Sequence, residues 1–275
     1  MRRIAEMVVV ITGASAGIGR QLAIDLHARG ARLALAARRA QKLDALNHEL
    51  GGGHLVVEAD VSRPADCARL ISAARERYGR IDTLIANAGY GFPATVCEST
   101  PQQVEQIFRT NVFGSIDCAR AAVGVMRGQS ARDGLRGQIM MVSSGAARRG
   151  LPFFGVYSAT KAAQLSLTEA MRIELEGEAI AVTSVHPIGT ETDFFTVAEA
   201  LGVTKIQSNM RRSWRQPVGR VTRAMVRAIA RPRREVWTSQ TTRVGLAVNA
   251  LFPSIGDAVM RKQKREIDAL NASGN

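Results

Sequence analysis

The segment YSATK, Tyr157 to Lys161, places a phenol and an ammonium four residues apart. On a helix, side chains at this spacing share a face, roughly 5–6 Å apart at Cβ. A Tyr that gives a proton to a carbonyl oxygen must regain it near neutral pH, although the ordinary pKa of a phenol is about 10. Lowering that pKa by ~3 units takes roughly 4 kcal/mol, which a neighbouring ammonium supplies in part. The pair therefore predicts an acid/base, while a half-buried Tyr beside a surface Lys gives the same spacing.

A glycine-rich loop, TGASAGIG (12–19), lies between an apolar run and a helical pattern. Gly13 lets the chain turn off a strand, and Gly17 and Gly19 let the backbone approach a pyrophosphate at the helix N-terminus. Ser15 and Ile18 belong to the same loop and are expected to line the site. The alternative is a turn that binds nothing, but its place after a buried strand favours a dinucleotide.

The second predicted strand ends in Ala36-Ala37-Arg38-Arg39, without an acidic residue. An acid there would hold ribose hydroxyls and repel a 2′-phosphate, whereas Arg38 can clamp that phosphate. The cofactor is therefore predicted to be NADP(H), against the alternative of a solvated Arg pair. Asp60 and Val61 follow the third strand and are expected at the adenine. A helix N-cap role for Asp60, in competition with Ser62, is the alternative.

Apolar β-branched runs alternate with helical patterns along most of the chain. This alternation predicts an α/β fold, a doubly wound, Rossmann-like parallel sheet with helices on both faces. Residues 1–239 are expected to form one NADP-binding catalytic domain, and residues 240–275 a helical basic extension with a break at Pro253. The predicted strands are 7–12, 31–37, 55–59, 81–86, 137–143, 180–186 and 234–239, and the predicted helices are 18–29, 40–50, 64–78, 101–127 and 156–177.

Charge is unevenly distributed in this 275-residue chain of net charge +13. Residues 205–275 hold 15 basic and 4 acidic residues, or +11, and the rest of the chain holds +2. Because this excess lies away from the predicted chemistry, nucleic acid is not expected as a partner. The three scattered Cys indicate free thiols in a reducing compartment, and the four His lack metal-ligand spacing. Without a signal peptide or an apolar span, a cytoplasmic protein is expected.

Three more motifs complete the pattern: ANAG (86–89) after the fourth strand, Asn111 within the helix 101–127, and Ser143-Ser144 after the fifth strand. Together with TGASAGIG, Asp60 and YSATK, they resemble the short-chain dehydrogenase/reductase family in its single-domain form of about 250 residues. The resemblance runs from about Met7 to Thr192.

This resemblance implies a role for each residue of a catalytic set. Ser144 would hold the substrate oxygen, and Tyr157 would be the acid/base. Lys161 would bind the nicotinamide ribose and lower the pKa of Tyr157. Asn111 would position a water that relays protons to solvent. Ser143 is the weaker of the two serines because its spacing is off by one.

The resemblance also implies cofactor contacts by Asn87, Ala88 and Gly89, and by the segment after the sixth strand. The family usually has Pro-Gly there with a Thr further on, but this chain reads HPIGTETDFF. Pro187 and Thr192 keep their places, and Ile188 replaces the Gly. Since Ile does not adopt positive φ cheaply, either the backbone differs or Gly189 takes over the turn.

Loops at 90–93, 148–154 and 190–215 carry Phe92, Phe153, Phe154, Phe194, Phe195, Met210 and Trp214. These residues predict an apolar pocket for a lipid-like, steroid-like or aromatic carbonyl, with loop packing as the alternative. The predicted function is an NADP(H)-dependent oxidoreductase, a carbonyl reductase or alcohol dehydrogenase. The alternatives are a 3-oxoacyl carrier-protein reductase and a non-catalytic nucleotide-binding sensor or scaffold.

Partners are expected in two regions. Helices 101–127 and 156–177 resemble the family's subunit contacts, which implies a homodimer or homotetramer. The basic C-terminal quarter is a solvated surface, a contact for an acidic partner, or a peripheral contact with an anionic membrane.

Overall fold

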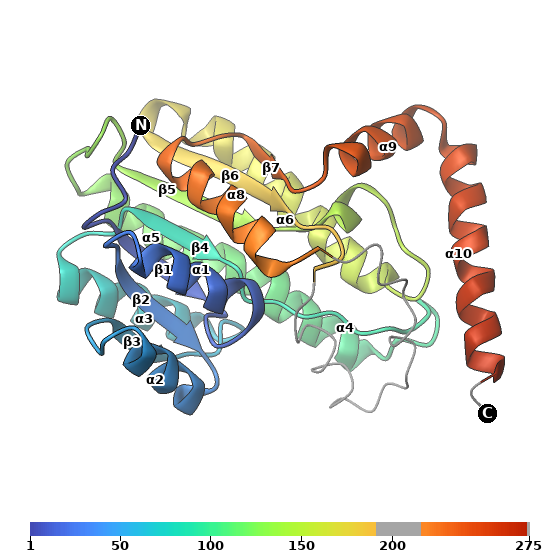
Figure 1. The fold of residues 1–275 in the computed structure, drawn as a ribbon, viewed down its shortest axis with the longest axis horizontal. Helices are drawn as coiled ribbons and strands as arrows, with labels where there is room; N and C mark the ends of the chain where they lie inside the picture. The colour runs from blue at the N-terminus through green and yellow to red at the C-terminus, as the bar shows by residue number, and fades with distance from the viewer. Residues whose placement is uncertain (191–215, 274–275) are drawn as a thin grey trace.

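The computed structural model describes residues 1–190 and 216–273 (Figure 1). These residues form a seven-stranded sheet in which all strands are parallel, in the order β3-β2-β1-β4-β5-β6-β7. The strands are β1 (Val8–Thr12), β2 (Arg32–Ala37), β3 (Leu55–Glu58), β4 (Thr83–Ala86), β5 (Gly137–Val142), β6 (Ile180–His186) and β7 (Glu235–Trp237). The predicted doubly wound fold is confirmed.

Helices connect the strands and cover both faces of the sheet. Those covering it are α1 (Gly17–His27), α2 (Ala40–Glu49), α3 (Pro64–Tyr78), α4 (Pro101–Phe108), α5 (Gly114–Arg127), α6 (Gly155–Glu174) and α8 (Val218–Ala230). A π turn, η1 (Arg109–Phe113), joins α4 to α5, so the predicted helix 101–127 is one helix with a wider turn inside it. Two 3₁₀ turns are η2 (Gly145–Arg148) and η3 (Glu176–Glu178).

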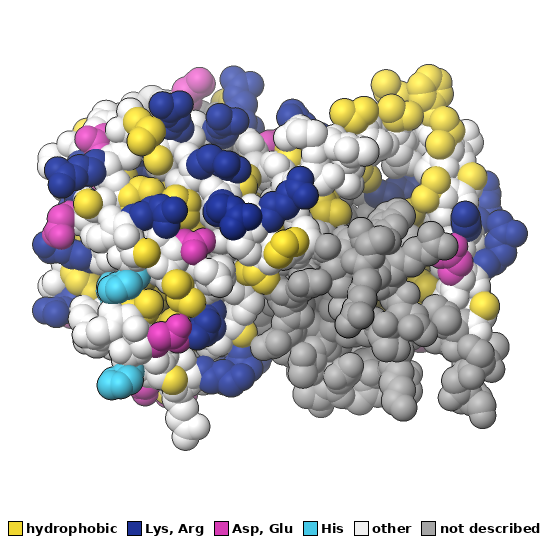
Figure 2. Space-filling model, in the orientation of Figure 1, with side chains coloured by type: hydrophobic (Ala, Val, Ile, Leu, Met, Phe, Trp, Pro, Cys, Tyr) yellow, Lys and Arg dark blue, Asp and Glu magenta, His cyan; other side chains and the backbone are white. Residues whose placement is uncertain are grey.

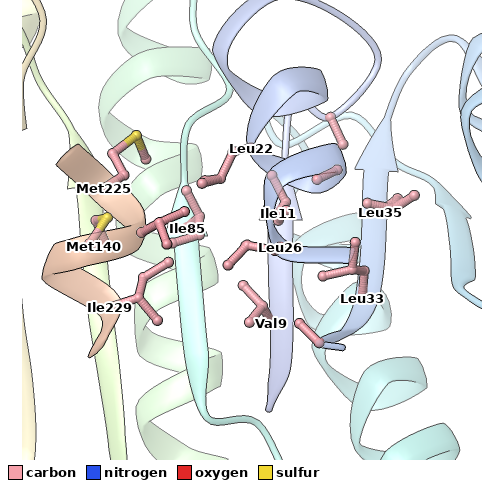
Figure 3. Close-up of a cluster of buried hydrophobic side chains, with 14 of the residues drawn as sticks. Val9, Ile11, Leu22, Leu26, Leu33, Leu35, Ile85, Met140, Met225 and Ile229 are labelled. Atoms are coloured by element: carbon pink, nitrogen blue, oxygen red, sulfur yellow. The ribbon is translucent and has the colours of Figure 1, made fainter. Parts of the chain in front are cut away.

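Burial explains why the strands have nearly continuous apolar sequences. On β1, Val9 and Ile11 face α1 and α8, while Val10 faces the opposite layer of α3 and α5. Figure 3 shows the first cluster, in which Leu22 and Leu26 of α1 meet Met225 and Ile229 of α8. Each such side chain, when fully buried, contributes about 1.5–3 kcal/mol to folding.

The strand order reverses between β1 and β4. The chain runs outward from β1 to β3 and then returns to place β4 beside β1. Loops after β1 and β4 diverge at this point, and the carboxyl ends of all the parallel strands meet along the same edge. A ligand crevice forms at such a switch point.

The C-terminal region contains α9 (Gln240–Leu251) and α10 (Pro253–Ser273), so the predicted helices and the break at Pro253 are confirmed. They form an arm that stands away from the sheet, as Figure 1 shows. An ion pair between Arg149 and Asp257 ties this arm to the loop after β5. Among the described residues, no helix combines the length and the apolar character that crossing a bilayer requires. The division at 239 stays a prediction.

Candidate active site

A cavity of about 830 Å³ lies at the carboxyl ends of the strands. Its walls come from the loops after the strands β1 to β6, from the first two turns of α6, and from the C-terminal arm. Almost all of the predicted site residues that the structure describes line it, although they come from seven separate segments of the chain. The exceptions are Gly19 and Asn111, which support the lining from behind.

The glycine loop has a main-chain surface. Gly13 has a φ of 66°, and a Cβ on Gly19 would lie 2.3 Å from the Gly13 carbonyl oxygen, so only glycine lets α1 approach the loop this closely. Asn87 holds the loop by donating from Nδ2 to the carbonyl of Thr12 at 2.9 Å. No side chain caps α1, so its first N–H groups remain for an anion.

Basic side chains surround the end of β2. Arg38, Arg39 and Lys42 all line the cavity, and Arg38 and Arg39 are exposed. Arg39 donates to the Ser15 hydroxyl at 3.1 Å, which links this cluster to the glycine loop. Of these three residues, only Arg38 was predicted from the sequence to contact the cofactor. The signal for Lys42 was its place in the first turn of the next helix, close in sequence to the end of the strand.

Asp60 shapes a turn at the end of β3. Its Oδ1 accepts from the main-chain N–H of Ser62 at 3.0 Å and from the Ser62 hydroxyl at 2.8 Å. The N-cap of α3 is Arg63, so the alternative of Asp60 as a helix cap is wrong. Asp60 and Val61 line the cavity beside Ala59.

Ser144 and Tyr157 meet in the cavity. The Ser144 hydroxyl is hydrogen-bonded to the phenol of Tyr157 and accepts from the N–H of Ala146 at 3.1 Å. Ser143 instead donates to the Lys161 carbonyl at 2.8 Å and is buried, so it supports the helix. The preference for Ser144 over Ser143 therefore agrees with the geometry. The ammonium of Lys161 lies 5.7 Å from the centre of the Tyr157 ring.

Burial dominates the titration of this pair. Burial raises the pKa of Tyr157 to about 12, against a smaller lowering by the hydrogen bond with Ser144. Burial also lowers the pKa of Lys161 to about 7. Without a bound cofactor, the expected lowering of the Tyr157 pKa by Lys161 is therefore wrong. The same burial that raises the pKa of Tyr157 also lowers the pKa of Lys161, so Lys161 carries less positive charge to stabilise a phenolate. The result at neutral pH is a protonated phenol, the form that donates.

Asn111 lies in the π turn and ties two segments together. Its Oδ1 accepts from the N–H of Tyr90 at 3.0 Å, and its Nδ2 donates to the Tyr90 carbonyl at 2.9 Å and to Thr160 at 3.0 Å. Gly89 passes close by, since a Cβ there would lie 3.0 Å from Asn111 Oδ1. The side chain of Asn111 is thus fully used in holding the β4 loop against α6.

A histidine that the sequence analysis did not assign supports Ser144 from behind. His186, at the end of β6, is fully buried, and its Nδ1 lies 3.1 Å from the Ser144 carbonyl. Since a carbonyl only accepts, Nδ1 carries the proton, and Nε2 accepts from Ser184 at 3.0 Å. The ring stacks on Trp237 at 4.3 Å. A polar residue directly before Pro187 at the end of a buried strand was the available signal.

The backbone after β6 answers the question raised by HPIG. Gly189 has a φ of 38°, whereas Ile188 stays outside the left-handed region, so Gly189 takes over the turn. The Ile188 side chain lies against Gly145, where a Cβ would be 2.2 Å from Ile188 Cδ1. Pro187 and Ile188 line the cavity. Thr192 lies outside the described residues.

One part of the cavity is apolar and is the candidate substrate side. It is lined by Leu151, Phe154 and Ile188, joined by Leu246 of α9 and Met260 of α10, which the sequence analysis missed. Two predicted pocket residues do not line it. Phe92 is buried in a separate cluster with Ile107, and Phe153 lies under Lys264. The remaining candidates, Phe194, Phe195, Met210 and Trp214, are outside the described residues.

The donors in this cavity fit a nicotinamide dinucleotide. The uncapped N-terminus of α1 suits its pyrophosphate, the basic cluster suits a phosphorylated ribose, and the buried ammonium of Lys161 suits the ribose beside the reacting ring. Within residues 1–190 and 216–273, no group of three or more His, Cys, Asp or Glu side chains is placed to hold a metal.

A doubly wound sheet with this cavity and a Ser–Tyr–Lys set defines a dinucleotide-binding oxidoreductase. The family model for short chain dehydrogenases matches residues 7–200, and the chain belongs to this family of oxidoreductases, which use nicotinamide cofactors. The resemblance seen in the motifs is confirmed.

Two relatives indicate how far the likeness extends. The chain is 42% identical over 190 residues to 11-beta-hydroxysteroid dehydrogenase 1A of Arabidopsis thaliana, a match that covers 66% of this chain and 51% of the relative. The chain thus spans about half the length of that plant protein. It is 31% identical over 267 residues to an uncharacterised oxidoreductase of Bacillus subtilis, covering 95% of this chain and 73% of the relative.

Two solved structures share the fold. One is a short chain dehydrogenase/reductase from Burkholderia phymatum in complex with NAD, with a TM-score of 0.81 and 25% identity over 93% of this chain and 97% of that one. The other is 3-ketoacyl-(acyl-carrier-protein) reductase from Brucella melitensis complexed with NADH, with a TM-score of 0.75 and 26% identity over 85% of this chain and 97% of that one.

Proposed function

We propose that this protein is an NADP(H)-dependent oxidoreductase that transfers a hydride between the nicotinamide and an apolar carbonyl or secondary alcohol. The observation that carries the proposal is the hydrogen-bonded pair of Ser144 and Tyr157, which faces an apolar cavity wall. The bound cofactor supplies or accepts the hydride. In reduction, Ser144 holds the carbonyl oxygen and Tyr157 donates its proton to it.

The preference for NADP(H) rests on the basic cluster at the end of β2. Arg38, Arg39 and Lys42 line one end of the cavity, where a 2′-phosphate provides a dianionic partner. No acidic side chain follows β2 to hold an unphosphorylated ribose. The two similar structures hold NAD and NADH, so the proposed preference for NADP(H) rests on this chain's own loop and not on the comparisons.

The apolar wall supports a bulky alicyclic or aromatic substrate. The plant relative is named a hydroxysteroid dehydrogenase, which agrees with such a wall. The 3-ketoacyl reductase with a similar fold supports the acyl-thioester alternative. Leu246 and Met260 favour the first, because they add apolar side chains of the arm to the cavity that Tyr157 also lines.

Consumption of NADPH by the purified protein tests the function. A panel of steroid, decalone and aryl ketones is compared with 3-oxoacyl thioesters, each with NADPH and with NADH. We expect turnover of the bulky ketones with NADPH. Preference for the thioesters would replace the substrate proposal by the alternative, and binding of NADPH without turnover of any carbonyl would favour the nucleotide sensor.

The partner proposals concern two surfaces. We propose a homodimer or homotetramer through η1, α5 and α6, where Phe113 of η1 and Ile173 of α6 are exposed. Light scattering at micromolar concentration tests it, and a monomer would contradict it. We likewise propose that the protein is located in the cytoplasm and contacts a membrane surface peripherally.

The second surface combines the elbow of the arm with α8. Figure 2 shows Lys and Arg side chains over α8 and hydrophobic side chains at the elbow on the same face. Arg220, Arg223 and Arg227 are exposed on α8, which suits anionic headgroups. The exposed apolar side chains of the elbow are Val244, Val248, Leu251, Phe252, Ile255 and Val259. Co-sedimentation with phosphatidylglycerol vesicles is expected, and equal binding to neutral vesicles would contradict the role of the arginines.

A further inference from the structure

The ammonium of Lys161 is held by two acceptors of the protein itself. Its Nζ donates to the Val142 carbonyl of β5 at 2.9 Å and to Oε1 of Gln164 at 2.8 Å. An ammonium has three donors, so one remains to point into the cavity. Gln164 lies on the same helix, one turn after Lys161, and its side chain is fully buried.

The amide of Gln164 has no unused hydrogen-bonding group on its nitrogen. Nε2 donates to the Asn111 carbonyl at 2.7 Å and to the Ser115 hydroxyl oxygen at 2.8 Å. Its orientation is fixed, because an ammonium only donates and a carbonyl only accepts. A flipped amide would set donor against donor at Lys161 and acceptor against acceptor at Asn111.

The Asn111 carbonyl is fully occupied by these contacts. Besides Gln164, it accepts from the Ser115 hydroxyl at 2.8 Å, so both of its lone pairs have side-chain donors. The resemblance implied that Asn111 positions a water that relays protons to solvent. Here an amide stands between Lys161 and that carbonyl. An amide at neutral pH holds its hydrogen atoms on nitrogen and does not pass a proton as water does.

We infer that Gln164 is a positioning residue that fixes Lys161 and closes the internal proton route beneath it, so that Tyr157 regains its proton from water in the cavity. This inference rests on the proposed function. In reduction, the O–H bond of Tyr157 breaks as an O–H bond forms on the substrate oxygen. The resulting phenolate then takes a proton from the buffer acid by way of cavity water.

The charged surroundings of Lys161 are simple. On its own helix, the titratable group beside the ammonium is Tyr157. Strand β5 contributes the Val142 carbonyl as an acceptor. The π turn is linked to Lys161 by way of the Gln164 amide. Burial is the cause of its lowered pKa. The Gln164 oxygen favours the charged form, so removing this acceptor lowers the pKa of Lys161 further.

Two variants separate positioning from packing. Gln164→Met keeps the volume but makes no hydrogen bond. Gln164→Ala leaves a polar space with three groups, Lys161, Asn111 and Ser115, that can hold a water. If Gln164 acts only by packing, Ala is the more damaging change. If it holds Lys161, Met is the more damaging change, since water partly replaces the amide in the Ala variant.

The first readout is NADPH affinity against pH, which needs no turnover. We expect Gln164→Met to weaken binding about tenfold near neutral pH, with a smaller loss for Gln164→Ala. Thr168→Val is the matched control, because Thr168 is equally buried on α6 and its hydroxyl donates to the main-chain carbonyl of Gln164, not to the side-chain amide that holds Lys161. Equal losses in Gln164→Met and Thr168→Val, or none in Gln164→Met, would overturn the inference.

The second readout is the dependence of kcat on the deuterium fraction of the solvent. A linear plot is expected for the wild type, since one proton moves, from Tyr157. A curved plot is expected for Gln164→Ala, where a restored water adds protons in flight. A wild-type plot as curved as that of the Ala variant would overturn the closed route. If the wild type reduces no carbonyl, the proposed function fails, and NADPH affinity alone decides whether Gln164 holds Lys161.

Discussion

On the β1–β2 side of the sheet the cavity is walled largely by main chain, whereas on the β5–β6 side it rests on buried polar side chains. The glycine loop meets the cavity with N–H groups and leaves no room for a Cβ at Gly19. Behind Ser144 and Lys161 lie His186, Gln164 and other buried polar residues, each bonded to a neighbour. The first wall depends on the absence of side-chain atoms at its glycines. The second depends on complete hydrogen bonding, because a buried polar group left without a partner lowers stability by about 1–3 kcal/mol.

The largest expected effect is on the side-chain wall. Tyr157→Phe keeps the ring and removes the proton, so we expect ketone reduction to fall by about 10²–10⁴-fold. NADPH affinity should stay within about twofold, because the groups proposed to bind most of the cofactor are the glycine loop, the basic cluster and Lys161, which this variant leaves unchanged. Stopped-flow NADPH oxidation and fluorescence titration measure the two. A variant that keeps most of its reductase activity would remove Tyr157 from the chemistry.

The basic cluster is the part of the β1–β2 side that depends on side chains. Arg38→Asp removes a clamp and adds repulsion, so we expect NADPH affinity to fall about thirtyfold while NADH affinity changes little. Titration with both cofactors measures this change in preference. Arg29→Asp, an exposed change just after the C-terminus of α1 and outside the cavity lining, is the charge control. Equal wild-type affinity for NADH and NADPH would contradict the assignment.

The arm adds a third wall that neither half of the sheet supplies. Leu246→Ser places a hydroxyl in the apolar lining, so we expect the KM for a bulky ketone to rise about tenfold. NADPH affinity should not change. Val244→Ser, on the exposed side of the same helix, is the matched control. If both variants behave alike in steady-state kinetics, the arm does not line the substrate site.

The smallest expected effect is a proton count. The pKa of Lys161 is about 7, so at pH 8 the free protein holds this group mostly neutral. The negative charge of bound NADPH raises that pKa, and binding therefore takes up a fraction of a proton. Calorimetry in two buffers of different ionisation enthalpy measures it, with Lys161→Met as the control. Release of protons on binding would show that the pKa shifts the other way.

The main-chain wall on the β1–β2 side and the side-chain wall on the β5–β6 side also differ in how much of each the sequence predicts. Gly13, Gly17 and the apolar β1 form a motif because backbone conformation restricts which residues fit. His186 and Gln164 were missed because a polar residue in a buried element looks the same in sequence whether its partner is a catalytic group or not. The fold followed from alternating strands and helices.

Helix α8 was missed for a related reason. Its apolar face, Val221, Met225 and Ile229, lies between arginines that obscure the pattern. The pKa of Tyr157 could not be obtained from sequence either. Spacing places Lys161 near it, but only the structure shows that burial acts on both groups at once.

The position of Leu246 and Met260 has a consequence for how such a protein diversifies. Among the described residues, those proposed to bind the cofactor and move the proton precede position 190, while this part of the proposed substrate wall is encoded after position 240. Recombination or mutation within codons 240–275 would therefore change the proposed contribution of the arm to substrate choice and leave the residues proposed for proton transfer unchanged. That part of specificity would be inherited separately from the chemistry, and grafting α9 and α10 onto a relative is the corresponding engineering experiment.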